Sequence, residues 1–357
     1  MTENEKTVQG LFRDNLSESF SSEDESRESS LTSNTAVSED SNFHVLHQGP
    51  LTNQVTKLRQ KDAEVDLVAE KMTSRRGDIW IEYPMADKIK TSAFQLFDAL
   101  TMIFTETGAK GEENLRLSLT NYMELRKLSD RKETRKQVKE DIHFLKSASL
   151  NWIGEDGKLN FVNFFDHGNF DPNTGDIEFS FTKRFGNILL NYPTMSYSVL
   201  TLQTDNKRNP NSYYFLRKIQ EHKRMNIGTQ RADIISVKTL IDSALNISLE
   251  EASAKGRHIT RDTIDRFERD MDALCEVLTW EYCHSKGKPV TDEELQDMDY
   301  KTFENLLVKV TWRNYPDQSQ LIAGRARRAE EAKKAKARQA KKTAKAKSKK
   351  TASKEKT

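Results

Sequence analysis

The feature that most constrains this chain is an internal repeat in which a helix leads into a strand. The segment at 131–153, RKETRKQVKEDIHFLKSASLNWI, resembles the segment at 261–283, RDTIDRFERDMDALCEVLTWEYC. The aligned pairs are Thr134 with Thr263, Val138 with Phe267, Asp141 with Asp270, Ile142 with Met271, Leu145 with Leu274, Leu150 with Leu278 and Trp152 with Trp280. Two amphipathic helices can match by chance, but the shared Leu-x-Trp strand favours a duplication. A repeat of this kind predicts two copies of one architecture.

The first half has the order of elements expected of a winged helix. A strand at 78–85 precedes a helix at 91–108, and a short strand at 116–118 leads into a helix–turn–helix pair. A β-hairpin at 150–165 follows, with Asp156-Gly157 as its turn signal. The expected helix ends are Thr91 or Ser92, Gly108, Thr120, and Ser129 or Asp130.

The second half repeats this order. Helices are expected at 209–226 and 259–274, the first with an Asn cap, and residues 233–245 are expected to form a short strand and a helix. Wing strands are expected at 276–283 and 306–316. A further helix at 289–306 is inserted in the wing. The predicted fold class is therefore α+β, with two tandem winged-helix domains related by internal duplication and disordered tails. The predicted segments are an arm at 1–50, a helical linker at 51–77, domains at 78–175 and 176–316, and a tail at 317–357.

Charge is distributed unevenly along the chain, although the formal net charge is only +2. Residues 1–50 hold ten acidic and three basic side chains and are rich in serine, which predicts a disordered acidic arm. Residues 323–357 hold fifteen basic and three acidic side chains without an apolar stripe. This basic tail is interpreted either as a solubilising segment or as a sequence-independent contact with nucleic-acid phosphates.

Targeting and cofactor signals are not found in the sequence. There is no secretory signal and no run of about 20 apolar residues, and the two cysteines indicate a reducing compartment, so a cytoplasmic protein is expected. Cys275 is expected in the core and Cys283 in a strand, without a metal site. His44 and His47 are expected to be polar linker residues. No P-loop or nucleophile–base set is present, so neither an enzyme nor a cofactor is predicted.

The second helix of each pair carries the candidate DNA-binding residues. In the first half, basic side chains repeat at spacings of three and four and share one helical face. In the second half, they gather at the helix N-terminus, where a recognition helix meets bases and phosphates. The candidates are Arg131, Lys132, Arg135, Lys136 and Lys139 in the first half, and Arg257, His258, Thr260, Arg261 and Arg266 in the second.

A solvated basic face is the alternative interpretation of each helix. Glu133, Glu140, Asp262 and Asp265 lie among the basic residues and would balance their charge. For one helix alone the two interpretations are equally good. Two basic second helices in two matching units favour double-stranded DNA as the partner.

The sequence also resembles a known family. The segments YMELRKLSDRKETRKQVKEDI, NPNSYYFLRKIQEHKRMN, DIISVKTLI, RFERDMDAL and LTWEYCHSKG resemble the plasmid-type replication initiator proteins of bacteria, which also occur on integrative mobile elements. The similarity covers roughly residues 78–316. The inserted wing helix and both tails depart from the family pattern, which leaves wing contacts at Lys286 and Lys288 open.

The resemblance implies a specific function. Two winged-helix domains would bind repeated origin DNA and help to recruit host replication proteins, with most base contacts made by the stretch Arg257–Arg269. The first domain would add DNA contacts and contacts in a homodimer. The alternatives are a transcription regulator of the same element, with the same fold, and an interaction or scaffold protein whose basic faces bind acidic partners.

Overall fold

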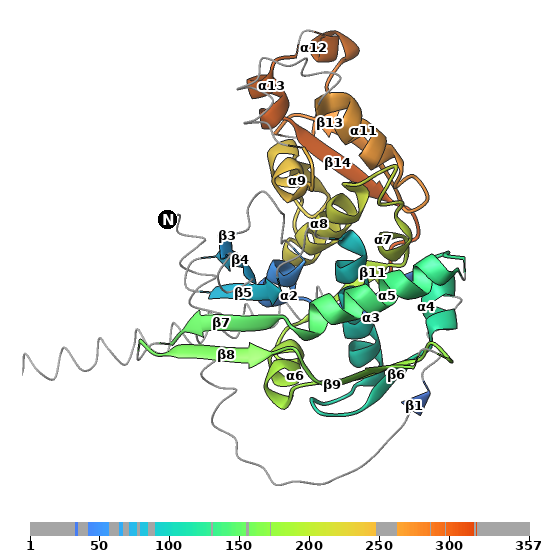
Figure 1. Cartoon of the computed structure of the whole chain (residues 1–357). Helices are drawn as coiled ribbons and strands as arrows, with labels where there is room; N and C mark the ends of the chain where they lie inside the picture. The colour runs from blue at the N-terminus through green and yellow to red at the C-terminus, as the bar shows by residue number, and fades with distance from the viewer. Residues whose placement is uncertain are drawn as a thin grey trace, which may run out of the picture.

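The chain is a mixed α+β protein with two hydrophobic cores (Figure 1). The computed structural model describes residues 33–34, 42–56, 64–66, 71–76, 79–84, 90–129, 131–154, 157–171, 173–247, 263–285, 287–296, 298–317 and 319. One long helix, α8 (Ser212–Met225), contributes Tyr213 and Tyr214 to the first core and Phe215 and Leu216 to the second. The two cores therefore share one rigid element.

The first unit is built around α3 (Thr91–Thr107), which is buried over most of its length. The elements that follow are β6 (Leu115–Leu117), α4 (Leu119–Leu125), α5 (Lys132–Lys146), β7 (Ser149–Ile153), β8 (Leu159–Asn163), β9 (Phe165–Phe170) and β10 (Ile177–Phe181). This order contains the predicted helix–turn–helix pair, α4 and α5.

The helices of the first unit were predicted correctly, but most of the residues that cap them were not. Gly108 ends α3 as expected, with a φ of 66° that favours glycine. The predicted N-terminal caps were wrong, because Lys90, Ser118 and Arg131 occupy the cap positions of α3, α4 and α5. At α4 the physical reason is clear, since the Ser118 hydroxyl accepts a hydrogen bond from the Asn121 amide.

The strands after α5 form two separate sheets. The predicted hairpin is present as β7 and β8, with Ser149 opposite Asn163. It belongs to a sheet of order β3-β4-β5-β7-β8, whereas β6 pairs with β10, and β10 with β9. The predicted domain boundary at 175/176 therefore falls within the β9–β10 hairpin.

The N-terminal residues that are described are ordered strands and a helix, which corrects two expectations. β2 (Phe43–His47) lies in the segment expected as disordered arm, as does β1 (Ser33–Asn34), which pairs with β6. α2 (Pro50–Val55) is a helix at the start of the expected helical linker. Further along the expected helical linker, the described residues form strands instead, β3 (Glu64–Asp66) and β4 (Lys71–Arg76), and β5 (Ile79–Pro84) follows. Pairing along β4 and β5 buries Met72 and Ile81, and this cross-strand burial outweighs local helix propensity.

The second unit is reached through α6 (Lys183–Leu190), β11 (Thr194–Ser198) and α7 (Leu200–Gln203). After α8 come β12 (Ile234–Ser236), α9 (Val237–Ser243), α11 (Asp265–Asp272), β13 (Leu278–Cys283) and β14 (Leu307–Trp312), and the sheet order is β12-β14-β13. The predicted wing insertion is present as two short helices, α12 (Asp292–Gln296) and α13 (Tyr300–Asn305).

The strand part of the repeat is not equivalent in the two units. Leu150 and Trp152 lie on β7, whose partners are β5 and β8. Leu278 and Trp280 lie on β13, in the same sheet as the strand before the helix pair. The tandem duplication therefore stays a prediction.

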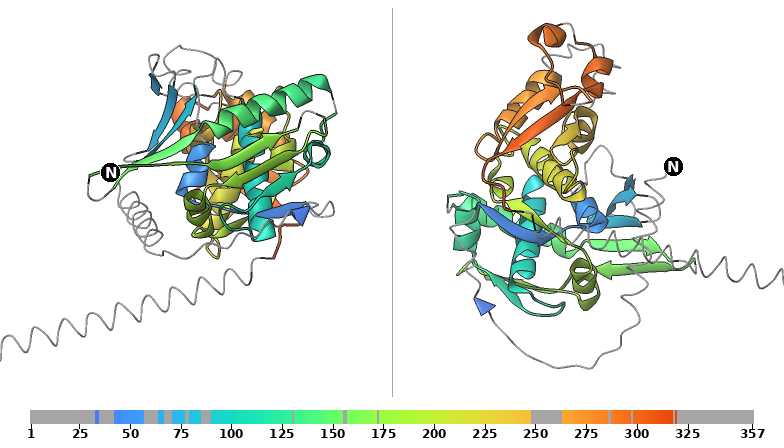
Figure 2. Two further views of the ribbon diagram at one scale, coloured as in Figure 1. Left: turned by 60° about the horizontal axis from the view of Figure 1, so that its bottom comes forward. Right: turned by 180° about the vertical axis from the view of Figure 1, so that it is seen from behind.

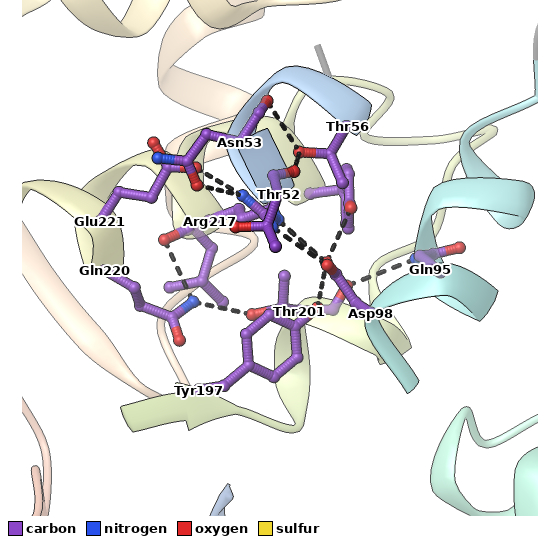
Figure 3. A network of polar contacts seen from close by, with 12 residues as sticks. Thr52, Asn53, Thr56, Gln95, Asp98, Tyr197, Thr201, Arg217, Gln220 and Glu221 are labelled. Carbon is purple, nitrogen blue, oxygen red and sulfur yellow. Dashed lines mark hydrogen bonds and ion pairs between the residues drawn. The ribbon is translucent and has the colours of Figure 1, made fainter. Parts of the chain in front are cut away.

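A buried polar network joins the two units (Figure 3). The Asp98 carboxylate on α3 accepts hydrogen bonds from Tyr197 (2.9 Å), Tyr213 (2.8 Å) and the Nε of Arg217 (3.0 Å). Arg217 lies on α8 and also donates to Glu221, one turn further along, at 2.5 Å. Asp98, Arg217 and Glu221 are at most 3 % exposed.

This network predicts a strong dependence of stability on Arg217. Arg217→Ala should lower the free energy of unfolding by about 3–5 kcal/mol, because it leaves the buried Asp98 carboxylate without its cation. Urea unfolding followed by circular dichroism measures the loss. Lys309→Ala is the control, since Lys309 pairs with Glu281 at 2.7 Å on the surface and its loss should leave stability nearly unchanged. Equal losses in the two variants would contradict the assigned role.

Candidate nucleic-acid interface

Helix α5 has a buried face and a basic face. Val138, Asp141 and Leu145 are buried against the first core. On the other face Arg131, Lys132, Lys136 and Lys139 are exposed, and Arg135 is half-buried. The structure thus brings the five predicted basic residues of this helix together at its exposed side.

A cation that sequence reasoning missed lies beside this face. Lys90, the residue before α3, donates to the Glu140 carboxylate at 2.5 Å and to Gln137 at 3.0 Å. Lys136 is 3.8 Å from the same carboxylate, and the hydrogen bond from Lys90 lowers the pKa of Glu140. Glu140 was expected to balance the positive charge of the helix, but Lys90 offsets the negative charge of Glu140. No local sequence signal could reveal this pair, because the two residues are 50 positions apart.

The position of α5 is fixed by a buried carboxylate. Oδ1 of Asp141 accepts hydrogen bonds from the Ser92 hydroxyl at 3.0 Å and the Gln137 amide at 2.7 Å. Ser92 lies in the first turn of α3, so Asp141 ties the basic helix to the N-terminus of the central helix. Burial raises the pKa of Asp141 to about 7, against the hydrogen bonds from Ser92 and Gln137, which lower it.

The aligned residue Asp270 makes the corresponding contact in the second unit. Its Oδ2 accepts hydrogen bonds from the backbone amide of Asn211 at 3.1 Å and the side-chain amide of Asn211 at 2.6 Å. Asn211 is the residue immediately before α8. Each unit thus uses an aspartate of its second helix–turn–helix member to hold the start of its first helix.

Most candidate residues of the second unit lie outside the described part of the chain. These are Arg257, His258, Thr260 and Arg261. Arg266 is described and exposed, near the start of α11. The described part of α11 carries mixed charge, because Asp265 and Asp272 are exposed beside Arg266 and Arg269.

Two expectations about other polar residues were wrong. His44 is buried, and its Nδ1 lies 2.8 Å from Glu106, while Nδ1 of His47 lies 2.8 Å from the Tyr192 carbonyl oxygen. Both belong to the paired strand β2 rather than to a linker. Cys275 is exposed instead of buried, because α11 ends at Asp272 and Leu274 takes the core position.

The described residues show neither a metal-ligand cluster nor a membrane-spanning helix. Within the ranges given above, no three His, Cys, Asp or Glu side chains are grouped so that they could hold a metal ion. No helix in that part of the chain is long and apolar enough to span a bilayer.

One protein family matches the first unit. Residues 52–204 match the family described as initiator replication protein, WH1. This region of the chain is similar to the WH1 domains of replication initiators. It includes α3, α4 and α5 and the network residue Asp98, and it extends past the predicted boundary at residue 175 to the end of α7. The family resemblance inferred from the sequence is confirmed.

Solved structures of initiators are also similar to the chain. The crystal structure of the Pi initiator protein in complex with iteron DNA has 11% identity and a TM-score of 0.41, and the match covers 63% of this chain and 91% of that one. Domains 2 and 3 of RctB have 13% identity and a TM-score of 0.41, with coverage of 74% and 96%. The WH1 domain of the replication protein MSBI1.176 has 12% identity, a TM-score of 0.23 and coverage of 32% and 81%. No curated protein sequence matches the chain.

The environment of Asp141 predicts a pH-dependent difference in stability. The Asp141 carboxyl has a higher pKa in the folded chain than in the unfolded chain. Its contribution to the free energy of unfolding is therefore fully present below about pH 4 and is lost as pH rises to about 7. Asn at this position cannot titrate. Relative to the wild type, Asp141→Asn should therefore gain on the order of 4 kcal/mol of unfolding free energy between pH 4 and pH 8. Denaturant titrations at both pH values measure the change, and parallel profiles would contradict the buried carboxyl's role.

Proposed function

We propose that the protein is a replication initiator of a plasmid or integrative mobile element that binds repeated double-stranded origin DNA through two winged-helix units. The observation that carries this proposal is the exposed basic face of α5 within an initiator WH1 domain. A recognition helix with several cations on one face suits a duplex, because phosphate neutralisation supplies much of the affinity. The proposal includes no catalytic step, and host replication proteins are recruited to the bound origin.

The two units have different roles in this proposal. The α5 face is rich in Lys and Arg but has few short polar side chains that could discriminate bases, so it acts mainly on the DNA backbone. The stretch Arg257–Arg261 combines Arg, His and Thr, which suit base edges as well as phosphates. The second unit therefore specifies the sequence.

This division can be tested by exchanging cations for alanine in one unit at a time. Replacement of Arg131, Lys132, Arg135 and Lys136 should lower affinity for all DNA, with the preferred sequence unchanged. Replacement of Arg257, Thr260 and Arg261 should bring specific binding down toward the non-specific level. Selection of bound sites from a random DNA pool compares each variant with the wild type. An altered preferred sequence in the first variant, with simple weakening in the second, would reverse the roles.

Binding alone does not distinguish initiation from the alternatives. A scaffold protein would show no preference between selected and scrambled DNA at any salt concentration. A transcription regulator would bind a specific site but would not support replication of a circular DNA that carries that site as its only origin. The initiator proposal requires both specific binding and origin-dependent replication.

We also propose that the β7–β8 hairpin forms a homodimer contact. The hairpin projects from the first unit in the views of Figures 1 and 2, and β8 is the edge strand of its sheet. Leu159 and Phe161 on that strand are 58% and 65% exposed. An apolar edge strand with unpaired backbone groups is suited to pairing with a second copy.

A charge on this strand should prevent the dimer. Phe161→Glu should shift the protein to monomers in sedimentation at concentrations where the wild type is dimeric, because a buried carboxylate would have no partner. Met225→Glu adds the same charge at another exposed apolar residue, 49% exposed at the end of α8, and should leave the dimer intact. A wild type that is monomeric at all concentrations would exclude this contact.

A further inference from the structure

The loop between α7 and α8, residues 204–211, lies between the two helix–turn–helix pairs. On one side it follows α7, which is fastened to the first pair. The Leu202 carbonyl oxygen accepts a hydrogen bond from Arg126 at 3.1 Å, and Gln203 donates to the Leu125 carbonyl oxygen at 2.9 Å. Leu125 and Arg126 are the last residue and the C-cap of α4, so this side of the loop adjoins the turn that leads into α5.

On its other side the loop is fastened to the second pair. Oδ1 of Asn211 accepts hydrogen bonds from the backbone amides of Leu245 at 2.8 Å and Asn246 at 3.1 Å. These residues follow α9, in the segment that leads toward α11. The side chain of Asn211 also donates to Asp270 on α11 itself. Eight residues thus connect the turn regions of both pairs.

The loop has a defined backbone and presents two cations. Oδ1 of Asp205 accepts hydrogen bonds from the amides of Lys207 at 2.9 Å and Arg208 at 3.1 Å. Asn206 donates to Gln95 on α3 at 2.8 Å, which anchors the turn to the first core. Lys207 is exposed, and the Arg208 side chain is 86% exposed.

The partner of Arg208 does not neutralise this site. Arg208 Nε lies 3.7 Å from Asp205, and an exposed pair at this distance is weak. The carboxylate of Asp205 is occupied mainly by the two loop amides, which lower its pKa. The guanidinium and ammonium groups remain accessible to an anion in solution.

We infer that Lys207 and Arg208 bind phosphates of the DNA segment that lies between the two sites contacted by α5 and by the second helix pair. This inference rests on the proposed function and adds a third contact to it. A duplex that engages both helix–turn–helix pairs would pass close to this loop, because the loop adjoins the end of α4 on one side and the segment after α9 on the other. Arg can hold a phosphate with two parallel hydrogen bonds, and Lys adds a point charge. The contact carries no base preference.

The test compares two double variants with equal charge change. Lys207→Ala/Arg208→Ala removes the loop cations. Lys110→Ala/Lys183→Ala is the control, because Lys110 follows the opposite end of α3 and both control side chains are exposed. Binding to a site selected by the wild type is measured from 50 to 200 mM salt. A loss of two phosphate contacts should reduce the slope of log affinity against log salt by about 1.8, so that the affinity advantage of the wild type falls roughly tenfold across this range.

A second measurement locates the contact on the DNA. Methylphosphonates replace the charged phosphates between the two contacted sites, and this change should weaken the wild type and the control but not the loop variant. The inference would be overturned if the loop variant and the control had equal salt slopes, or if the neutral linkages weakened both to the same extent. In either case, specific binding by the wild type would still support the proposed function. Absence of specific binding by the wild type would instead refute the proposed function.

Discussion

The pairing of Arg217 with Asp98 is the interaction on which the arrangement of the two units depends. Arg217 reaches from α8, which lines the second core, into the wall of the first core. The Asp98 carboxylate receives two tyrosine hydroxyls as well as the guanidinium, and the Arg217 guanidinium also meets Glu221 and the side-chain oxygen of Asn53 (Figure 3). Buried charges are costly unless they are fully paired and hydrogen-bonded, so this geometry tolerates little change in the angle or distance between the units. An apolar contact of the same area would permit sliding, whereas a directed network does not.

Each unit also has a buried aspartate that fixes the position of its helix–turn–helix pair. Asp141 holds α5 to the start of α3, and Asp270 holds α11 to the start of α8. A negative charge beside a helix N-terminus is also favoured by the helix dipole. The surroundings differ, since Oδ2 of Asp141 has no hydrogen-bond partner, whereas Asp270 is bonded through both oxygens. The second unit therefore holds its aspartate with the more complete set of hydrogen bonds.

The sequence predicted the elements that depend on local periodicity. The helix positions of both pairs followed from apolar spacing, and the β7–β8 hairpin followed from its turn signal. The repeat aligned Asp141 with Asp270, but their contacts became visible only in the structure. Pairings between distant segments could not be predicted. The sequence around β2 is polar and acidic, yet its pairing with β11 buries Leu46 and His44. Lys90 was missed for the same reason, because its partner Glu140 is adjacent only in space.

The rigid arrangement has a consequence for how DNA would be bound. Two units on a flexible linker can adjust to different spacings, and the second binding event then depends on linker length. Here α8, the buried ion pair and the loop at 204–211 fix both pairs together, so the entropy of ordering the units is lost during folding rather than during binding. Adding one base pair to a duplex moves one half-site by about 3.4 Å and rotates it by roughly 35° relative to the other, and a fixed pair of units cannot follow that change. If both units bind DNA as proposed, the interaction that orders the two cores would therefore also restrict the spacing of the DNA sites that they could occupy together.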